Sequence, residues 1–289
     1  MTALTAITGR LADRAPDSRR GRAAGDAALL FDAPGPRGRV RILIVSLVVA
    51  VLLIAIVVAG LHQLSSAGQL DYVKWRYFLG QSIVNYLGEA ILKTLRAAGI
   101  AAVLSFPIGI ALGWARMARS TALRGAVGLW IDAMRAIPML LLVYFFLLAV
   151  PRWGPTLPSM WMLVVPIVMC TSATTAEVFR SGVRSLDAGQ SEAAVALGLS
   201  SGQTMRLVLA PQALRLMLPT LITQMVTILK DTSLGYVVAY GELMHATKVL
   251  TNAAGFDVYL PAYVVVALIY VVINWLLSAA ARRIEARSR

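Results

Sequence analysis

The fold is decided by residues 187–211, which read DAGQSEAAVALGLSSGQTMRLVLAP. Asp187 is a preferred helix N-cap residue, and Gln190 follows three positions later, as in a capping box. The alanine-rich stretch after Gln190 favours continued helix, and Gly198 is typical of the position just beyond a helix end. The first half of this segment therefore predicts a short helix that stops before Gly198.

The second half of the segment repeats the same signals. Ser200 and Gln203 again have capping-box spacing, so a second helix is expected to begin there and to pass Pro211 into the next apolar run. The two helices form a compact elbow, which we call the coupling segment (residues 187–211). A short, small-sided helix held between two long ones suits a rigid knob that fits a groove on a partner and transmits its motion.

The composition places the chain in a membrane. Of its 289 residues 58% are hydrophobic and only 14% are charged, an apolar excess that a soluble domain of this size does not bury. Six apolar runs are long enough to span a bilayer as helices, so the predicted fold is an all-α polytopic membrane protein. The runs are residues 42–59, 97–115, 127–150, 160–178, 216–239 and 259–281.

Basic residues are distributed unevenly among the segments that connect these runs. If the N-terminus is cytoplasmic, most of the 27 Lys and Arg lie inside, and only Arg135 and Lys230 lie within spans. The positive-inside rule favours this orientation, so we expect a multi-pass protein of the cell membrane with both termini cytoplasmic. The net charge of +13 then reflects topology and contact with membrane lipid, and nucleic acid is not an expected partner.

The N-terminal region differs from the rest in composition. Residues 1–41 are rich in Arg, Ala, Gly, Pro and Asp, so a disordered basic cytoplasmic arm is expected, followed by an additional first transmembrane helix at residues 42–59. The alternative is a cleaved leader over residues 1–67, since Arg39 and Arg41 precede the apolar run and small residues follow it. Such a leader is unusually long, and the run suits a span better than a signal core.

The second apolar run contains a pattern for helix packing. Gly109 and Gly113 form a G-x-x-x-G pair, which permits close approach of a neighbouring helix. Pro107 precedes the pair and is able to kink the helix. The pattern predicts close packing and carries no information about a substrate.

Polar residues recur along the fifth run at helical spacing. Neighbouring helix positions point about 100° apart, so positions three or four apart share one face, which is expected to meet protein or water rather than lipid. Two interpretations remain open. The stripe lines a translocation path, with Lys230 for a carboxylate and Asp231 for an ammonium group, or it links helices through hydrogen bonds. A direct ion pair between these two adjacent residues is not expected. The polar stripe comprises Thr220, Thr223, Gln224, Thr227, Lys230 and Asp231.

Two groups of charged residues near the ends of spans are expected to be structural. Arg135 is able to pair with Asp132 one turn earlier, and Pro138 is expected to kink the third span just beyond it. A hinge or an anchor near the cytoplasmic face is therefore favoured over contact with cargo. Glu177 and Arg180 similarly predict a salt-bridged helix end that supports the coupling segment.

No catalytic or metal-binding constellation is recognisable in the sequence. His62 and His245 are isolated, the single cysteine Cys170 lies in an apolar run, and no glycine-rich phosphate loop occurs. We therefore expect no catalytic residue, no metal site and no cofactor bound by this chain. Energy for any transport has to come from a partner.

The coupling segment resembles the E-A-A loop of ATP-binding-cassette importer permeases. It has Glu192-Ala193-Ala194, Gly198, Val208 and Pro211 at the spacing of that family, and departs from it at Ala210, where leucine is usual. Flanking motifs resemble the polar-amino-acid branch, and the likeness covers roughly residues 85–285. Those motifs are Arg135-Ala-Ile-Pro138, Glu177-Val-Phe-Arg-Ser-Gly182, Pro211-Gln-Ala and Lys230-Asp-Thr-Ser-Leu234.

This resemblance implies a type I importer permease fold with a cytoplasmic coupling helix and a permease domain over residues 85–285. It implies that Ala194 and Gly198 pack against a nucleotide-binding subunit while Glu192 helps to orient the helix. It also implies the partners: a dimer of ATP-binding subunits that holds ATP and Mg, a second permease subunit in a heterodimer, and an extracellular or lipid-anchored amino-acid-binding protein.

A narrower resemblance concerns the cargo. Residues 30–39, which read LFDAPGPRGR, together with the added first span are similar to the second permease of actinobacterial glutamate importers. This implies glutamate, with glutamine, aspartate or cystine as alternatives. The competing class is an ATPase-independent secondary transporter or channel, against which the coupling segment argues. A membrane enzyme is a third class, disfavoured because His, Cys and carboxylate residues are not grouped.

Overall fold

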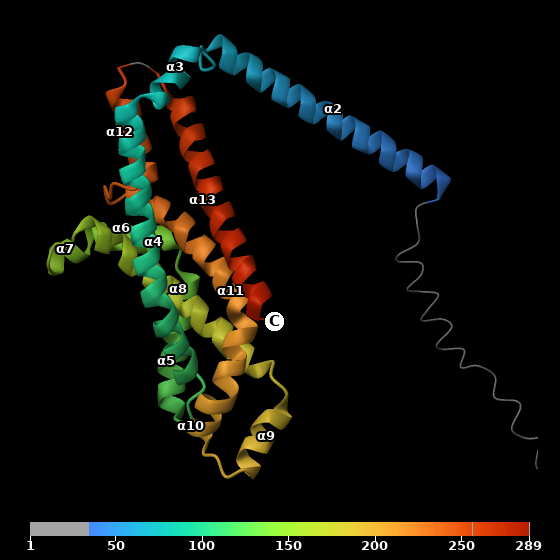
Figure 1. The fold of residues 1–289 in the computed structure, drawn as a ribbon, viewed down its shortest axis with the longest axis vertical. Helices are drawn as coiled ribbons and strands as arrows, with labels where there is room; N and C mark the ends of the chain where they lie inside the picture. Colours follow the sequence, from blue (N-terminus) through green and yellow to red (C-terminus); the bar gives the residue numbers. More distant parts are fainter. Residues whose placement is uncertain (1–34, 256, 289) are drawn as a thin grey trace, which may run out of the picture. The chain divides into compact units, whose positions relative to one another are not determined.

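The computed structural model describes residues 35–255 and 257–288, so residues 1–34 of the predicted arm (residues 1–41) lie outside the described residues. The described residues form helices and connecting turns without a strand (Figure 1). They divide into two units, one that ends at Ala67 and one that begins at Gly68. The first unit contains α2 (Pro36–Ser66). The second contains α3 (Tyr72–Arg76), η1 (Tyr77–Leu79), α4 (Gln81–Ala115), α5 (Thr121–Ala136), α6 (Met139–Leu148), α7 (Val150–Trp153), α8 (Ser159–Arg184), α9 (Ala188–Ala196), α10 (Ser201–Gln203), η2 (Thr204–Leu209), α11 (Ala210–Asp231), η3 (Thr232–Tyr236), α12 (Leu243–Ala253) and α13 (Tyr259–Ser288).

Several of these helices are long and apolar enough to cross a membrane. Five qualify among the described residues: α2, α4, α8, the continuous helical run Ser201–Tyr236 and α13. A sixth span is obtained if the bent pair Thr121–Ala136 and Met139–Trp153 is taken as one. The prediction of an all-α polytopic protein is confirmed. The additional first span is longer than expected, because α2 starts at Pro36, which suits the first helical turn since it lacks an N–H.

The second predicted span begins earlier than the hydropathy of the sequence indicated. α4 starts at Gln81 rather than Ala97, so Lys93 and Arg96 lie within the helix and not in an outer connection. Leu87, on this early part of the helix, is buried in a cluster with residues of α12 and α13. The charged side chains occupy the exposed face. Packing against later parts of the chain therefore fixes a helix that local hydropathy obscures.

The third predicted span is broken rather than merely kinked. α5 ends at Ala136 and α6 begins at Met139, and the two helices meet at 96°. Ile137 between them has the extended conformation φ −80°, ψ 126°. This is the conformation favoured before a proline, because the ring of Pro138 disfavours helical geometry at the preceding residue.

The G-x-x-x-G pair on α4 packs closely against α8, as predicted. A Cβ atom at Gly109 would lie 2.5 Å from Cβ of Thr175 and 2.7 Å from the carbonyl oxygen of Ser172. At Gly113 it would lie 2.6 Å from the carbonyl oxygen of Ala176. No side chain fits at either position, so the two glycines set the spacing of these helices.

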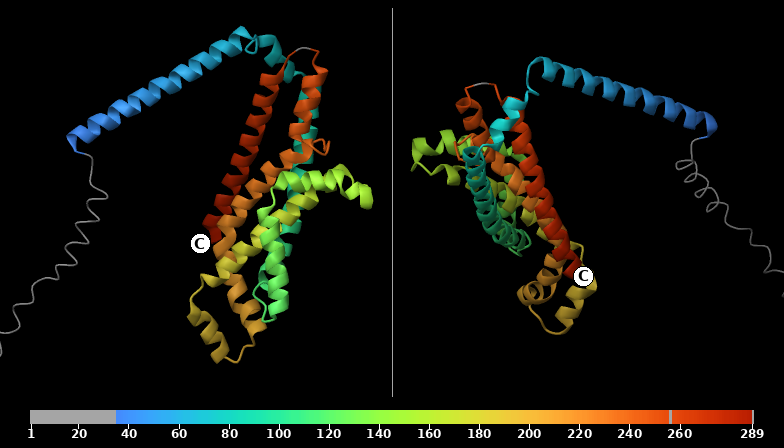
Figure 2. Two further views of the ribbon diagram at one scale, coloured as in Figure 1. Left: turned by 180° about the vertical axis from the view of Figure 1, so that it is seen from behind. Right: turned by 45° about the horizontal axis from the view of Figure 1, so that its top comes forward.

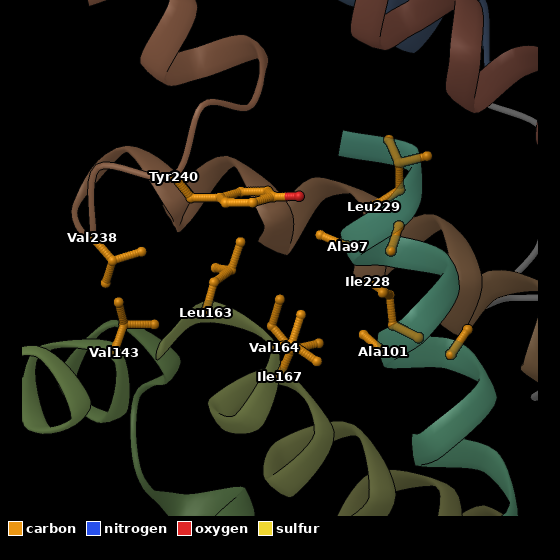
Figure 3. Packing of buried hydrophobic residues seen from close by; sticks show 12 residues of the cluster. Ala97, Ala101, Val143, Leu163, Val164, Ile167, Ile228, Leu229, Val238 and Tyr240 are labelled. Carbon is orange, nitrogen blue, oxygen red and sulfur yellow. The ribbon is translucent and has the colours of Figure 1, made fainter. Parts of the chain in front are cut away.

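The largest buried cluster joins α4, α6, α8, α11 and the turn after η3. α4 contributes small residues such as Ala97 and Ala101, and α8 contributes the larger Leu163 and Ile167, which face them (Figure 3). This alternation of small and large side chains lets the helices interdigitate. The core thereby holds α11, which carries the polar stripe, against α8.

The second unit has two distinct ends. In Figures 1 and 2, α9 and α10 lie at one end, beside the start of α5, and α12 lies at the other end. α11 runs diagonally between them, and α6 and α7 project sideways. The coupling segment and the turn before α12 are therefore connected through the length of α11.

Candidate functional site

The first helix of the coupling segment, α9, is defined by caps at both ends. Asp187 Oδ1 accepts a hydrogen bond of 2.7 Å from the amide of Gly189. After the helix, Gly198 has φ +80°, and the amides of Gly198 and Leu199 return to carbonyls of the last turn at 2.9 and 3.1 Å. These bonds form a Schellman motif, which needs a residue that tolerates left-handed geometry. The predicted cap and the predicted glycine end are both confirmed.

The second helix begins with the predicted capping box. The amide of Ser200 donates to Gln203 Oε1 at 2.9 Å, and the amide of Gln203 donates to Ser200 Oγ at 3.4 Å. α10 then continues through the π-helical turn η2 into α11, with Pro211 in the first turn of α11. A π-turn moves the hydrogen-bonding register, which accommodates a proline inside a continuous helical path.

Gln190 has a different contact from the one expected. Its side chain does not complete a capping box on Asp187. Gln190 Oε1 instead accepts a hydrogen bond of 3.1 Å from Nε2 of Gln212, which also donates to the carbonyl of Val208 at 3.0 Å. The bond crosses the elbow and ties α9 to the start of α11. A local spacing rule could not reveal this partner, because it lies on another helix.

Burial within the chain divides α9 into two faces. Ala194 is only 3% exposed, whereas Val195 and Leu197 are 61% and 82% exposed. The expectation that Ala194 packs against a partner subunit is therefore corrected, because its methyl group is covered by its own chain. The side of α9 away from Ala194, with Glu192, Ala193 and Val195, is exposed, and so is Leu197 in the turn that follows. We call these four residues the outward face of α9.

An ion-pair network lies where α4, α5 and α8 meet. Arg116, just after α4, pairs with Asp132 of α5 at 3.0 Å and with Glu177 of α8 at 3.3 Å. Arg180 Nε donates to Glu177 at 3.1 Å, which confirms the predicted Glu177 to Arg180 contact. Glu177 thus joins two arginines at the end of the bundle from which the coupling segment emerges. We call these four residues the Glu177 network.

The predicted partner of Arg135 is wrong. Asp132 bonds both Nη atoms of Arg116 at 3.0 Å, and the described residues hold no ion pair between Asp132 and Arg135. Sequence reasoning missed Arg116, because its partners lie on two other helices. The only available signal was a basic residue directly after the G-x-x-x-G helix. Pro138 was predicted to kink the third span, and the break between α5 and α6 lies at this residue.

The polar stripe lies along the accessible side of α11. Thr220, Thr223, Thr227 and Lys230 are exposed in the isolated chain, and Gln224 and Asp231 are half-buried. Thr223 and Thr227 donate their hydroxyl hydrogens to carbonyls of the preceding turn, at 3.1 and 3.2 Å. Their hydrogen-bonding capacity is thus partly met within α11, so no second helix of this unit is needed to satisfy them.

A cavity adjoins each end of the polar stripe. One, of about 400 Å³, adjoins the coupling-segment end and contains Glu177 of the Glu177 network beside Thr220. The other, of about 320 Å³, adjoins the α12 end and contains Lys230. The first is lined by Glu177, Val178, Ser181, Gly182, Ser185, Leu216, Met217 and Thr220, and the second by Lys230, Ser233, Met244, Tyr263, Val266, Ala267 and Tyr270.

The charged residues of the stripe are available for contacts outside this unit. Within the described part of the chain, neither Lys230 nor Asp231 is in an ion pair, in accord with their adjacent positions on α11. The described residues also contain no group of three or more His, Cys, Asp or Glu that could hold a metal ion. The arrangement offers one cation, one carboxyl group and several hydroxyls along a single helix.

Comparison with known proteins identifies this arrangement. Residues 105–289 match the family described as the binding-protein-dependent transport system inner membrane component. The chain belongs to this family. The match includes the coupling segment, the Glu177 network and the polar stripe, so these features lie within the part of the chain that defines the family.

Two curated relatives are similar over most of their lengths. The glutamate transport system permease protein GluD of Corynebacterium glutamicum is 39% identical over 231 residues, which are 78% of this chain and 84% of that protein. The probable glutamine ABC transporter permease protein GlnP of Bacillus subtilis is 36% identical over 208 residues, 72% of this chain and 95% of that protein.

The fold is also that of a solved transporter. The crystal structure of an amino acid ABC transporter with histidines matches with a TM-score of 0.67 at 23% identity, covering 71% of this chain and 95% of that one. The chain is therefore a permease subunit of an amino-acid ABC importer and an inner-membrane component. It is a transport component, and the ATPase is a separate subunit.

Proposed function

We propose that this permease forms one side of the path along which a polar amino acid, most simply glutamate, enters the cell. The observation that carries the proposal is the polar stripe, which exposes hydroxyls and Lys230 along α11 and ends at a cavity at each extremity. Placing such groups against lipid is costly. A path filled with water and cargo is the environment that suits them.

The chemistry of the stripe matches that of an amino acid. In this proposal Lys230 receives a carboxylate of the cargo and Asp231 its ammonium group, while Thr220, Thr223, Gln224 and Thr227 offer weaker polar contacts. The competing role is that of links to a neighbouring permease helix, through hydrogen bonds within the membrane. Substitution distinguishes the two roles. Loss of a residue that links helices should impair assembly of the complex, whereas loss of a residue that lines the path should impair transport by an assembled complex.

The coupling segment is proposed to connect the permease to its energy source. A dimer of ATP-binding subunits, which carries the ATP and Mg, would receive the outward face of α9 in a groove. Two exposed apolar side chains on that face, Val195 and Leu197, support this assignment. The caps at Asp187 and Gly198 and the bond from Gln190 to Gln212 would keep α9 rigid while it transmits force.

We further propose the composition and orientation of the assembly. A second permease subunit would complete the path as a heterodimer, and an extracellular or lipid-anchored binding protein would deliver the amino acid. Both termini would be cytoplasmic, with residues 1–41 as a basic arm, residues 42–59 as an added membrane anchor and residues 85–285 as the permease domain. Membrane lipid would surround the spans, and nucleic acid would have no part.

The proposed mechanism is alternating access. Closure of the ATP-binding subunits would draw the coupling segments together, and the helices attached to them would move as bodies, opening the path to the opposite side. α8 leads directly into α9, and the Glu177 network joins α8 to α4 and α5. Movement of α9 would therefore also move the helices that surround the polar stripe.

Competition uptake tests the cargo. The complete complex, reconstituted in vesicles with its own binding protein, should take up labelled glutamate in an ATP-dependent manner. An excess of unlabelled glutamate should suppress this uptake more strongly than glutamine, aspartate or cystine at equal concentration. Stronger competition by glutamine would show that glutamine, and not glutamate, is the preferred cargo. The similarity to a probable glutamine permease favours this alternative.

A further inference from the structure

A buried carboxyl group lies at the α12 end, outside the polar stripe. Glu242 connects η3 to α12 and is 0% exposed. Its oxygens accept hydrogen bonds of 2.7 Å from the backbone amides of Met244 and His245, and one of 2.9 Å from the hydroxyl of Tyr270 on α13. A carboxyl group is costly to bury, and donors of this kind offset the cost.

The backbone around Glu242 is also attached to α4. The amide of Leu243 donates to Thr94 Oγ1 at 3.2 Å, and the hydroxyl of Tyr240 donates to the carbonyl of Lys93 at 3.0 Å. In Figure 3 the hydroxyl of Tyr240 points toward the helix that carries Ala97. The turn that contains Glu242 is therefore fixed to two helices, α4 and α13.

Close packing on η3 completes the enclosure of this side chain. A Cβ atom at Gly235 would lie 2.7 Å from Cγ of Glu242, so only glycine leaves room for the carboxyl group there. α12 thus starts at a point that contacts η3, α4 and α13 through specific atoms. Movement of α12 relative to α13 would require the bond between Glu242 and Tyr270 to break.

A helix cap alone does not explain this arrangement. Capping α12 requires only the two backbone amides, and an Asp, Ser or Thr is able to do so at the surface. The third donor, Tyr270, comes from another helix. Tyr270 of α13 and Met244 of α12 also both line the cavity that contains Lys230.

We propose that Glu242 is a positioning residue for transport: its bond to Tyr270 ties α12 to α13 and holds the Met244 and Tyr270 sides of the Lys230 cavity in place. This rests on the proposed function only in taking the Lys230 cavity as part of the path. Glu242 itself is enclosed and does not contact the amino acid. It determines how far the α12 end of the path is closed.

The test measures access to the cavity, without cargo. In a Cys170→Ser background, Met244→Cys is introduced and the rate of its reaction with a hydrophilic maleimide is measured in the detergent-solubilised complete complex. Tyr270→Phe removes the bond to Glu242, together with the contacts of the same hydroxyl with Thr94 and Thr232, and leaves the cap of α12 intact. We expect it to raise the labelling rate about fivefold, the factor that corresponds to one net hydrogen bond.

Matched controls separate this effect from general loosening. Tyr259→Phe makes the same change on an exposed tyrosine of α13, and Glu89→Gln neutralises an exposed carboxylate of α4. Neither should change the labelling rate. Glu242→Gln should raise it at least as much as Tyr270→Phe, because an amide cannot accept all three hydrogen bonds. Combining the two substitutions should add little to the effect of Glu242→Gln alone.

Uptake by the same variants, without the Met244→Cys substitution, provides the functional result. Tyr270→Phe should reduce the maximal uptake rate of whichever amino acid the complex carries, with the subunits still assembled. Unchanged labelling and uptake in Tyr270→Phe would overturn the proposal and leave Glu242 as a helix cap. Because labelling requires no cargo, a wrong assignment of glutamate would alter the uptake competition and leave the labelling result as it is.

Discussion

The two ends of the second unit are held by different interactions. All three ion pairs of the described residues lie at the coupling-segment end, among side chains such as Asp132 that retain contact with solvent. At the α12 end a fully buried Glu242 is held by hydrogen bonds alone. Solvated ion pairs are individually weak and exchange partners easily, whereas a buried hydrogen-bonded carboxyl group tolerates little displacement. The coupling-segment end therefore suits the proposed contact with a moving partner, and the α12 end suits a fixed geometry.

The largest effect is expected at the glycine that ends α9. Gly198→Val places a β-branched side chain at φ +80°, where such residues are strained, and adds bulk next to the outward face of α9. Uptake should fall to background and the ATP-binding subunit should no longer copurify, with insertion into the membrane unchanged. Gly202→Ala is the control, since a Cβ there meets open space within a helix. Normal uptake by Gly198→Val would refute the docking role of the segment.

A smaller effect is expected in the stripe between the two ends. Asp231→Asn removes a charge proposed to receive the ammonium group of the cargo while preserving the shape of the side chain. The uptake rate should fall and the assembled complex should be recovered in normal yield. Thr223→Val provides a comparison, since its hydroxyl is already bonded within α11 at 3.1 Å. An unchanged rate in Asp231→Asn would assign the stripe to helix association.

The α12 end should make stability depend on pH. Burial raises the pKa of Glu242 from its ordinary value of 4.5 to about 7, although three donors favour the carboxylate. Between these values the folded chain holds a proton that the unfolded chain has released, so the unfolding free energy falls as pH rises through this window. The melting temperature of the complex should show this fall, and Glu242→Gln should lack it. An identical pH profile for both proteins would contradict the assignment.

Substitutions in the Glu177 network, at the coupling-segment end, should have the smallest effects of those considered, and these concern the free energy of unfolding. Glu177→Gln leaves Arg116 and Arg180 without their shared carboxylate, at a cost of about 2 kcal/mol for hydrogen bonds to charged groups. Asp132→Asn should cost less, about 0.5 kcal/mol, because the side chain of Asp132 is 58% exposed. Melting temperatures of the two variants compare these values directly. A larger loss in Asp132→Asn would reverse the order of importance within the network.

The coupling segment was predictable because its signals are local. Asp187, Ser200 with Gln203, and Gly198 act on backbone groups within a few residues, so their spacing in the sequence indicates the caps that form. The close packing at Gly109 and Gly113 was predictable for the same reason, since a stripe of small residues is visible on one helix. Pro138 indicated a bend, and the size of the bend depends on what α6 packs against.

Contacts between distant segments could not be predicted. Arg116 finds its partners on α5 and α8, and Gln190 finds Gln212 across the elbow. The sequence around Glu242 does not indicate that this side chain is buried. Its donors, two backbone amides and Tyr270, are brought to it only when α12 and α13 are in place. The early start of α4 was hidden by Lys93 and Arg96, whose charges lower local hydropathy although they point outward. In each case the deciding neighbour is remote in sequence.

Docking of the outward face of α9 on the ATP-binding subunit can be measured directly by cross-linking. In a Cys170→Ser background, Leu197→Cys and Trp153→Cys are compared in the complete complex with a thiol cross-linker. Both native side chains are 82% exposed, but Leu197 lies in the turn after α9 and Trp153 at the end of α7. We expect Leu197→Cys to become cross-linked to the ATP-binding subunit and Trp153→Cys to remain unlinked. An assembled, active complex in which Leu197→Cys gives no such product, or in which both positions give it equally, would show that α9 does not dock in this way.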